Sequence, residues 1–249
     1  MRNHQWLAAC QVTPESFAPV LPRLDPCMTP LVTLCQGQVA EPHAHTSGGG
    51  LLSNLARHNG ASMAYRFGPS RLPWHAFMGG DAWDAAPGRS AGRSPVQRHV
   101  GQGDGGLGCA PAGVAKAGHE AVGVATQGCG RLGPGDHGPV AMYLGYVSSK
   151  GHTLVAQRLF LPKEWTKAKA RLDKAGVPTA YRAYRTRHQL ALEMLAKKGA
   201  GLPHGWMSGD AEMGRPYWFR RRLATLGERY WLAVPSHTAM RDLETAPPE

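Results

Sequence analysis

The sequence lacks several features that mark particular classes of protein. It contains no run of 18 apolar residues, so we expect no transmembrane helix. Its first 30 residues have no apolar block behind a basic start, which argues against a secretory signal. The five cysteines are widely spaced and include no Cys-x-x-Cys pair, so a structural zinc site is not expected. Together these absences favour a protein of a reducing cytoplasm.

Acidic residues are also few, and the resulting positive charge is concentrated in one segment. The chain has 17 Asp and Glu against 28 Lys and Arg, a formal net charge of +11. Residues 150–198 contain 12 basic and 3 acidic side chains, whereas the remaining segments are close to neutral. Concentrated positive charge predicts a face that binds a polyanion such as nucleic acid. A solvated basic surface is the alternative interpretation.

The chain divides by pattern into an N-terminal region, residues 1–100, and a C-terminal domain, residues 101–249. Residues 1–45 are rich in proline and show no sustained period, which predicts short helical pieces or loose chain. Apolar residues between 51 and 65 favour two short helices, candidate remnants of DNA-binding helices. Residues 79–108 carry many glycines, so we expect a flexible stretch that packs poorly.

After about residue 138 the pattern predicts regular elements. Residues 140–147 and 152–161 form an antiparallel hairpin, and Thr186 caps a helix that extends to residue 198. A short strand at 206–208, a helix at 215–226 with one apolar side and a strand at 230–234 follow. A hairpin followed by a strand-helix-strand unit predicts an α/β mixed sheet. This is the order of RNase H-like domains, which need one further strand first; residues 107–110 are the only candidate.

Five motifs occur in order along this domain. They are the Gly-Val-Ala-Lys segment opening residues 113–133, Arg-Leu-Phe-Leu-Pro-Lys-Glu-Trp (158–165), His-Gln-Leu-Ala-Leu-Glu-Met (188–194), Gly-Asp-Ala-Glu-Met-Gly (209–214) and Tyr-Trp-Leu-Ala-Val-Pro (230–235). In this order and spacing the chain resembles the DDE transposases of bacterial insertion sequences, from about residue 43 to residue 249. The resemblance implies an RNase H-like catalytic domain that binds the element's terminal inverted repeats and cuts or joins DNA strands.

The resemblance also implies metal chemistry. Such enzymes hold two Mg²⁺ ions with three carboxylates, because Mg²⁺ prefers hard oxygen ligands. Asp210 matches the second carboxylate, and its alternative role is to cap the following helix. Glu212 lies nearby but has no catalytic role in the motif.

The other two carboxylates are absent from the matching positions. Ala110 stands where the first Asp would precede the Gly-Val-Ala-Lys segment, and Asp104 is six residues too early. The surrounding glycines also make a poor strand. The third acid is expected beyond residue 249, and Glu249 lies in a proline-rich tail. We therefore expect a degenerate, C-terminally truncated copy that binds Mg²⁺ weakly or not at all, a pseudoenzyme.

The basic segment supplies candidate DNA contacts, which are Lys163, Lys167, Lys169, Arg182, Arg185 and Arg187. Trp165, Tyr181 and Tyr184 lie among them, either to stack on unpaired bases or to pack internally. The run Arg220–Arg222 is interpreted as a solvated helix face. His43 and His45 precede three glycines without a third ligand, which favours a loop over a metal site.

Two further interpretations remain beside an inactive transposase. The chain is alternatively a non-enzymatic DNA-binding module or trans-inhibitor of an intact transposase, or it is a pseudogene product that never folds stably. The expected partners are DNA and either a second copy or an intact transposase. The expected location is the bacterial cytoplasm, at the nucleoid.

Overall fold

The computed structural model describes residues 22, 26, 28, 29, 32, 40–67, 93–128 and 135–238. The chain divides into two compact units, Met1–Gly92 and Arg93–Glu249. Predictions made for most of residues 1–39, for 79–92 and for the tail after 238 fall outside the described residues.

The described part of the N-terminal unit includes the helices α4 (Ala40–Leu51) and α5 (Gly60–Phe67). Ala44 of α4 is buried with Val32, while Met63 and Ala64 of α5 form a second small cluster. Of the two short helices expected between residues 51 and 65, the second is present as α5, whereas the first is wrong because α4 ends at Leu51 and residues 52–59 are not helical. The loop predicted at His43 and His45 is also wrong, because both residues lie within α4. No group of three potential metal ligands occurs in any described part of the chain.

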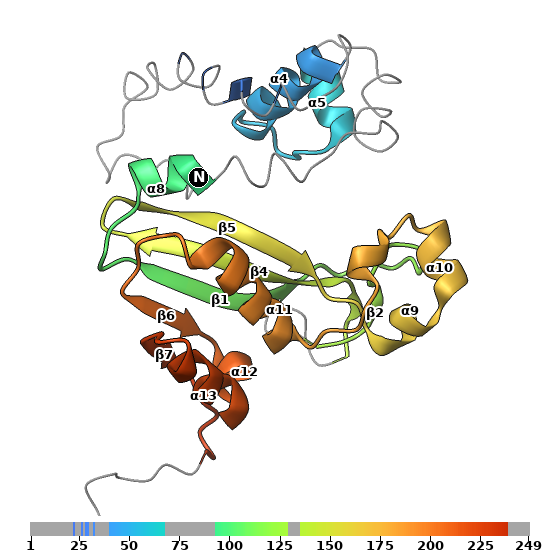
Figure 1. Cartoon of the computed structure of the whole chain (residues 1–249). Coiled ribbons are helices and arrows are strands. Elements are labelled where there is room, and N and C mark those ends of the chain that lie inside the picture. The colour runs from blue at the N-terminus through green and yellow to red at the C-terminus, as the bar shows by residue number, and fades with distance from the viewer. Residues whose placement is uncertain are drawn as a thin grey trace, which may run out of the picture. The chain divides into compact units, whose positions relative to one another are not determined.

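The second unit is built around a five-stranded sheet of order β5-β4-β1-β6-β7 (Figure 1). Its strands are β1 (Gly106–Gly113), β4 (Val140–Ser148), β5 (Gly151–Leu159), β6 (Trp206–Gly209) and β7 (Tyr230–Leu232). β4 is antiparallel to β1 and β5, whereas β6 is parallel to both β1 and β7. A small sheet pairs β2 (Ala125–Thr126) with β3 (His137–Gly138). The predicted RNase H-like α/β mixed sheet is confirmed.

Helices connect and cover these strands. They are α8 (Arg93–His99), α9 (Lys163–Lys167), α10 (Lys169–Lys174), the 3₁₀ turn η1 (Thr179–Tyr181), α11 (Arg187–Met194), the π-helical turn η2 (Leu195–Gly199), α12 (Ala211–Gly214) and α13 (Tyr217–Thr225). Figure 1 shows α11 lying across the sheet, with α9 and α10 beyond the end of the hairpin. Thr186 and Gln189 form the capping box that starts α11, which confirms the predicted cap.

The core lies between the sheet and the helices α11 and α13. Leu107 and Met207 of the parallel strands are fully buried there, against Met194 of α11 and against Phe219 and Leu223 of α13. The prediction of one apolar side on α13 is partly wrong, because Trp218 and Leu226 are exposed. Residues 219 and 223 are one helical turn apart, whereas 218 points about 100° away from 219.

The predicted weakness of the glycine-rich stretch is wrong for residues 93–108. Residues 93–99 form α8, Val96 and Val100 pack against the core, and Leu107 is fully buried. β1 pairs along its whole length with β4 and along half of it with β6, so backbone hydrogen bonds hold it. Gly106 and Gly108 alternate with Leu107 and Cys109, so their missing side chains are on the face away from this core.

Candidate active site

The candidate centre lies where the parallel strand β6 ends beside the middle of β1. Asp210 directly follows β6, and one oxygen, Oδ1, accepts a hydrogen bond of 3.0 Å from the backbone N–H of Met213. This carboxylate therefore caps α12, which is the alternative role that the sequence suggests. Its second oxygen accepts no hydrogen bond from the residues that the structure describes, so it remains available to a ligand.

Ala110 is the neighbour of Asp210 on the adjacent strand. The register pairs Cys109 with Gly209, so Ala110 and Asp210 are the next residues along two parallel strands about 5 Å apart. Ala110 is exposed and offers only a methyl group to this position. Asp104 lies in the turn before β1, at the opposite end of the strand and up to about 20 Å from Ala110 at 3.3 Å per residue.

Glu212 is the nearest acidic residue along the chain, but an arginine engages it. Both of its carboxylate oxygens accept hydrogen bonds from Arg187, at 3.0 and 2.9 Å. The same arginine donates to the carbonyl of Gly128, and His188 Nε2 lies 2.9 Å from the carbonyl oxygen of Glu212. The start of α11 therefore clamps the turn that carries Asp210, and Glu212 acts as a structural partner of Arg187.

The neighbouring thiol does not replace the missing carboxylate. Burial, with a smaller contribution from the Asp210 carboxylate, raises the pKa of Cys109 to about 12. The thiol is therefore protonated at neutral pH, whereas a metal ligand needs the thiolate. With one carboxylate beside a methyl group, the described residues do not fit the two-metal site that the transposase resemblance implies.

The glycines of the Gly-Asp-Ala-Glu-Met-Gly motif allow close packing around Asp210. A Cβ atom on Gly209 would lie 2.9 Å from Cβ of Met213 and 3.2 Å from the carbonyl oxygen of Cys109. A Cβ atom on Gly214 would overlap the backbone carbonyl of Ala233. Both positions therefore require glycine because the chain after β7 and the turn of α12 pack against each other.

We expect Gly214→Ala to lower the free energy of unfolding by about 1–3 kcal/mol, because a backbone carbonyl has to move away from the new methyl group. Urea denaturation of the purified variant measures this loss. Gly103→Ala is the matched control, since a Cβ atom there meets nothing within 4 Å. Equal stability of the two variants would contradict the close approach.

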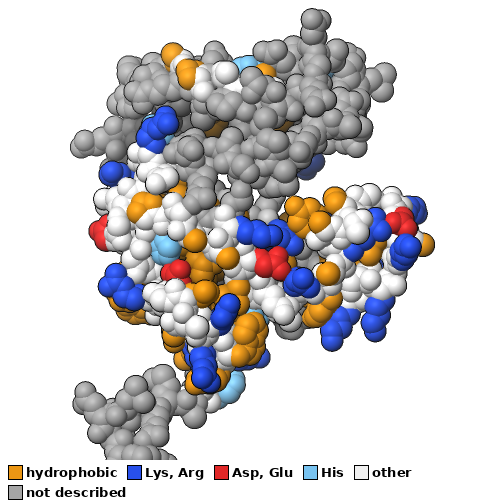
Figure 2. Space-filling model, viewed as in Figure 1, with side chains coloured by type: hydrophobic (Ala, Val, Ile, Leu, Met, Phe, Trp, Pro, Cys, Tyr) orange, Lys and Arg blue, Asp and Glu red, His pale blue; other side chains and the backbone are white. Residues whose placement is uncertain are grey.

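The six predicted DNA contacts fall into two groups. Lys163, Lys167 and Lys169 are exposed on α9 and at the start of α10, and none has an ion-pair partner among the described residues. The three arginines each bind a carboxylate: Arg182 that of Asp173 at 2.5 Å, Arg185 that of Glu193 at 2.9 Å, and Arg187 that of Glu212. Figure 2 shows Lys and Arg side chains gathered over the lobe that contains α9 and α10.

The aromatic residues of the basic segment also differ from one another. Trp165 is fully buried with Leu161, Leu172 and Val177, so it is a packing residue and does not stack on DNA bases. Tyr181 and Tyr184 are 44% and 36% exposed, with Arg158 and Lys163 respectively over their rings. Sequence reasoning did not identify Phe160, whose ring lies edge-on to that of Tyr184 with centroids 6.3 Å apart.

Arg187→Met should destabilise the turn after β6, because Glu212 would keep a partly buried charge without its partner. The Arg187 side chain is only 13% exposed, so we expect a loss of about 1–3 kcal/mol in unfolding free energy. The double variant Arg187→Met/Glu212→Gln should lose less than the sum of the single variants. Arg185→Met, at an exposed ion pair, is the control and should lower the unfolding free energy by less than about 1 kcal/mol. If the losses of the Arg187 and Glu212 variants simply added in the double variant, the two side chains would not stabilise each other.

Of the comparisons with known proteins, the one with family models found a match. The described helices include none that is long and apolar enough to cross a membrane. Searches of curated proteins and of solved structures found no match. The family model described as "DDE superfamily endonuclease" matches residues 35–249. Endonucleases act on nucleic acid, and DDE enzymes typically use a divalent metal. Because this match covers most of the sequence, the chain belongs to the DDE superfamily endonuclease family.

Proposed function

We propose that the chain is a transposase-type protein that binds the terminal inverted repeats of an insertion sequence but does not itself cut DNA. The observation that carries the proposal is the position of Ala110 on β1 and Asp210 after β6, each one residue beyond the last paired residues, Cys109 and Gly209. A single carboxylate beside a methyl group leaves Mg²⁺ mostly hydrated, since this ion gives up its waters only to several competing anions. The protein would act at the bacterial nucleoid.

DNA binding does not depend on the lost carboxylate, because the candidate phosphate contacts lie on other elements. Lys163, Lys167 and Lys169 belong to α9 and α10, separate from the turn that carries Asp210. Exposed lysines without carboxylate partners are suited to bind phosphates, and each contact releases a counterion from DNA. The three paired arginines would have to exchange a carboxylate for a phosphate, so we assign them a smaller share of the affinity.

A salt titration tests the proposed binding. Fluorescence anisotropy with a labelled inverted-repeat duplex should give an association constant that falls steeply with salt. The slope of its logarithm against the logarithm of salt concentration should be about −0.9 for each phosphate contact. Absence of binding at low salt, or binding that does not change with salt, would contradict the proposal.

The same features favour a second candidate role, as a trans-inhibitor of an intact transposase. A protein that retains DNA-binding lysines and lacks a first carboxylate would occupy inverted repeats without processing them, alone or in a mixed oligomer. Adding the purified chain to an intact transposase and its DNA should then reduce cleavage in proportion to occupancy of the ends. Unchanged cleavage at saturating chain would exclude this role.

A further inference from the structure

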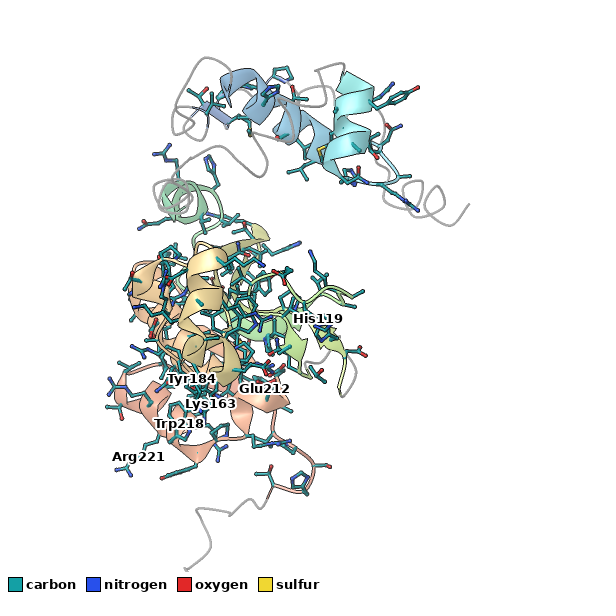
Figure 3. The ribbon with its side chains drawn as sticks, turned by 90° about the vertical axis from the view of Figure 1, so that its right-hand side faces the viewer. His119, Lys163, Tyr184, Glu212, Trp218 and Arg221 are labelled. Carbon is teal, nitrogen blue, oxygen red and sulfur yellow. The ribbon has the colours of Figure 1, made fainter. Side chains whose placement is uncertain are left out.

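A groove of about 470 Å³ lies beside the turn that carries Asp210. Its walls come from four places in the sequence: β2 with the residues after it, the segment that leads from β5 into α9, the start of α11, and Glu212 of α12. Figure 3 shows Lys163, Tyr184 and Glu212 on the same side of this unit. A volume of this size is typical of sites that bind small organic groups.

One wall of the groove is aromatic. The ring of Tyr184 is partly exposed, and the ring of Phe160 meets it at an interplanar angle of 66°. Phe160 in turn contacts Arg187, whose guanidinium lies 5.0 Å from the centre of the Phe160 ring, so a second layer of side chains packs behind this wall. An exposed ring held at its edge can stack with a flat group, and every nucleobase has such a face.

The floor of the groove is polar but electrically balanced. Arg187 is neutralised by Glu212, and the Gln127 side chain donates to the carbonyls of Gly123 and Gly138 at 3.0 and 2.9 Å. Two charged lining residues have no ion-pair partner among the described residues, the neighbours Lys163 and Glu164; the Lys163 ammonium lies 5.3 Å from the centre of the Tyr184 ring at the rim. A floor without net charge, with Lys163 as its one unpaired cation and the Glu164 carboxylate close by in the sequence, suits a nucleobase with a single phosphate outside better than it suits a cluster of phosphates.

We propose that this groove holds one unstacked nucleobase of the bound DNA, stacked on Tyr184, with the adjoining phosphate on Lys163. The inference rests on the proposed DNA binding and names the part of the DNA that this groove recognises. Extracting a base from a duplex costs pairing and stacking energy, which a single-stranded extension does not require. The groove therefore favours DNA ends with unpaired nucleotides over blunt duplexes.

The test compares a blunt duplex with the same duplex carrying a short single-stranded extension that contains 2-aminopurine. Wild-type protein should bind the extended DNA about tenfold more tightly and change the 2-aminopurine fluorescence, because stacking of one base on an aromatic ring supplies this preference. Tyr184→Ala should abolish both effects, whereas Tyr184→Phe should retain them. Tyr181→Ala is the matched control, since this tyrosine is somewhat more exposed than Tyr184, lies outside the groove and should behave as wild type.

The outcomes separate this inference from the proposed function. Blunt-duplex binding without a preference for the extension, or a preference that survives in Tyr184→Ala, would overturn the groove alone. Equal losses in Tyr184→Ala and Tyr181→Ala would overturn it as well. Binding of the single-stranded extension alone, lost in Tyr184→Ala, would support the groove while contradicting duplex recognition. Binding of neither DNA would overturn both.

Discussion

Trp165→Ala is expected to lower the free energy of unfolding of the α9–α10 lobe by about 3–5 kcal/mol. Trp165 is fully buried, its Nε1 donates a 2.8 Å hydrogen bond to the carbonyl of Val124, and the Arg171 guanidinium lies 3.6 Å from its ring centre. This one side chain joins α9, α10 and the segment before β2. Its loss would leave a cavity and an unpaired carbonyl in a small satellite core, which has few other contacts to compensate.

Hydrogen exchange over residues 161–177, together with a thermal melt of the whole chain, measures this loss. Trp231→Ala is the matched control, since the Trp231 side chain is 79% exposed on β7 and should change stability by less than about 1 kcal/mol. Protection in the lobe that is unchanged by Trp165→Ala would show that Trp165 does not hold it together. A cooperative melt of the wild type is also inconsistent with a chain that never folds.

Replacing Lys167 and Lys169 together with alanine is expected to weaken DNA binding by about 30-fold near 0.15 M salt, because two phosphate contacts are lost. The salt dependence should change as well: the slope of the logarithm of the binding constant against the logarithm of salt concentration should become shallower by about 1.8. Both lysines are exposed, so their removal should leave the fold intact. Anisotropy titrations at several salt concentrations give the affinity and the slope in one experiment.

The matched control is the double variant Lys150→Ala/Lys197→Ala. It removes the same charge from two exposed positions, the hairpin turn and the π-helical turn, away from α9 and α10. The control should lose little affinity and keep the wild-type slope. If both double variants weakened binding equally, net charge rather than the α9–α10 surface would account for the affinity.

The elements predicted from sequence are those whose signals are local. The hairpin of β4 and β5 and the capped start of α11 at Thr186 follow from alternation, a turn and a capping box, which neighbouring residues encode. β1 lacks such signals, because its glycines favour no strand. Its stability comes from β4 and β6, which pair with it from about 30 to 100 residues away. Only the order of the other elements pointed to a strand there.

In the candidate site, too, some features follow from local sequence patterns and others depend on residues far apart in the chain. The motif spacing placed Ala110 and Asp210 at matching positions, and the parallel register of β1 and β6 makes them neighbours. The pairing of Arg187 with Glu212 and the meeting of Phe160 with Tyr184 join residues 24 to 25 positions apart, and no local pattern encodes them. The basic segment predicted charge without showing that Arg182, Arg185 and Arg187 bind carboxylates, whereas Lys163, Lys167 and Lys169 have no such partner among the described residues.

The most direct test of the account is a strand-cleavage assay with the purified chain and an inverted-repeat DNA in Mg²⁺ or Mn²⁺. The central claim is that Asp210, beside the Ala110 methyl group, does not assemble a metal centre for cleavage. The account predicts DNA that is bound but neither nicked nor joined, with the same result for Asp210→Ala. Metal-dependent products that disappear in Asp210→Ala would contradict it.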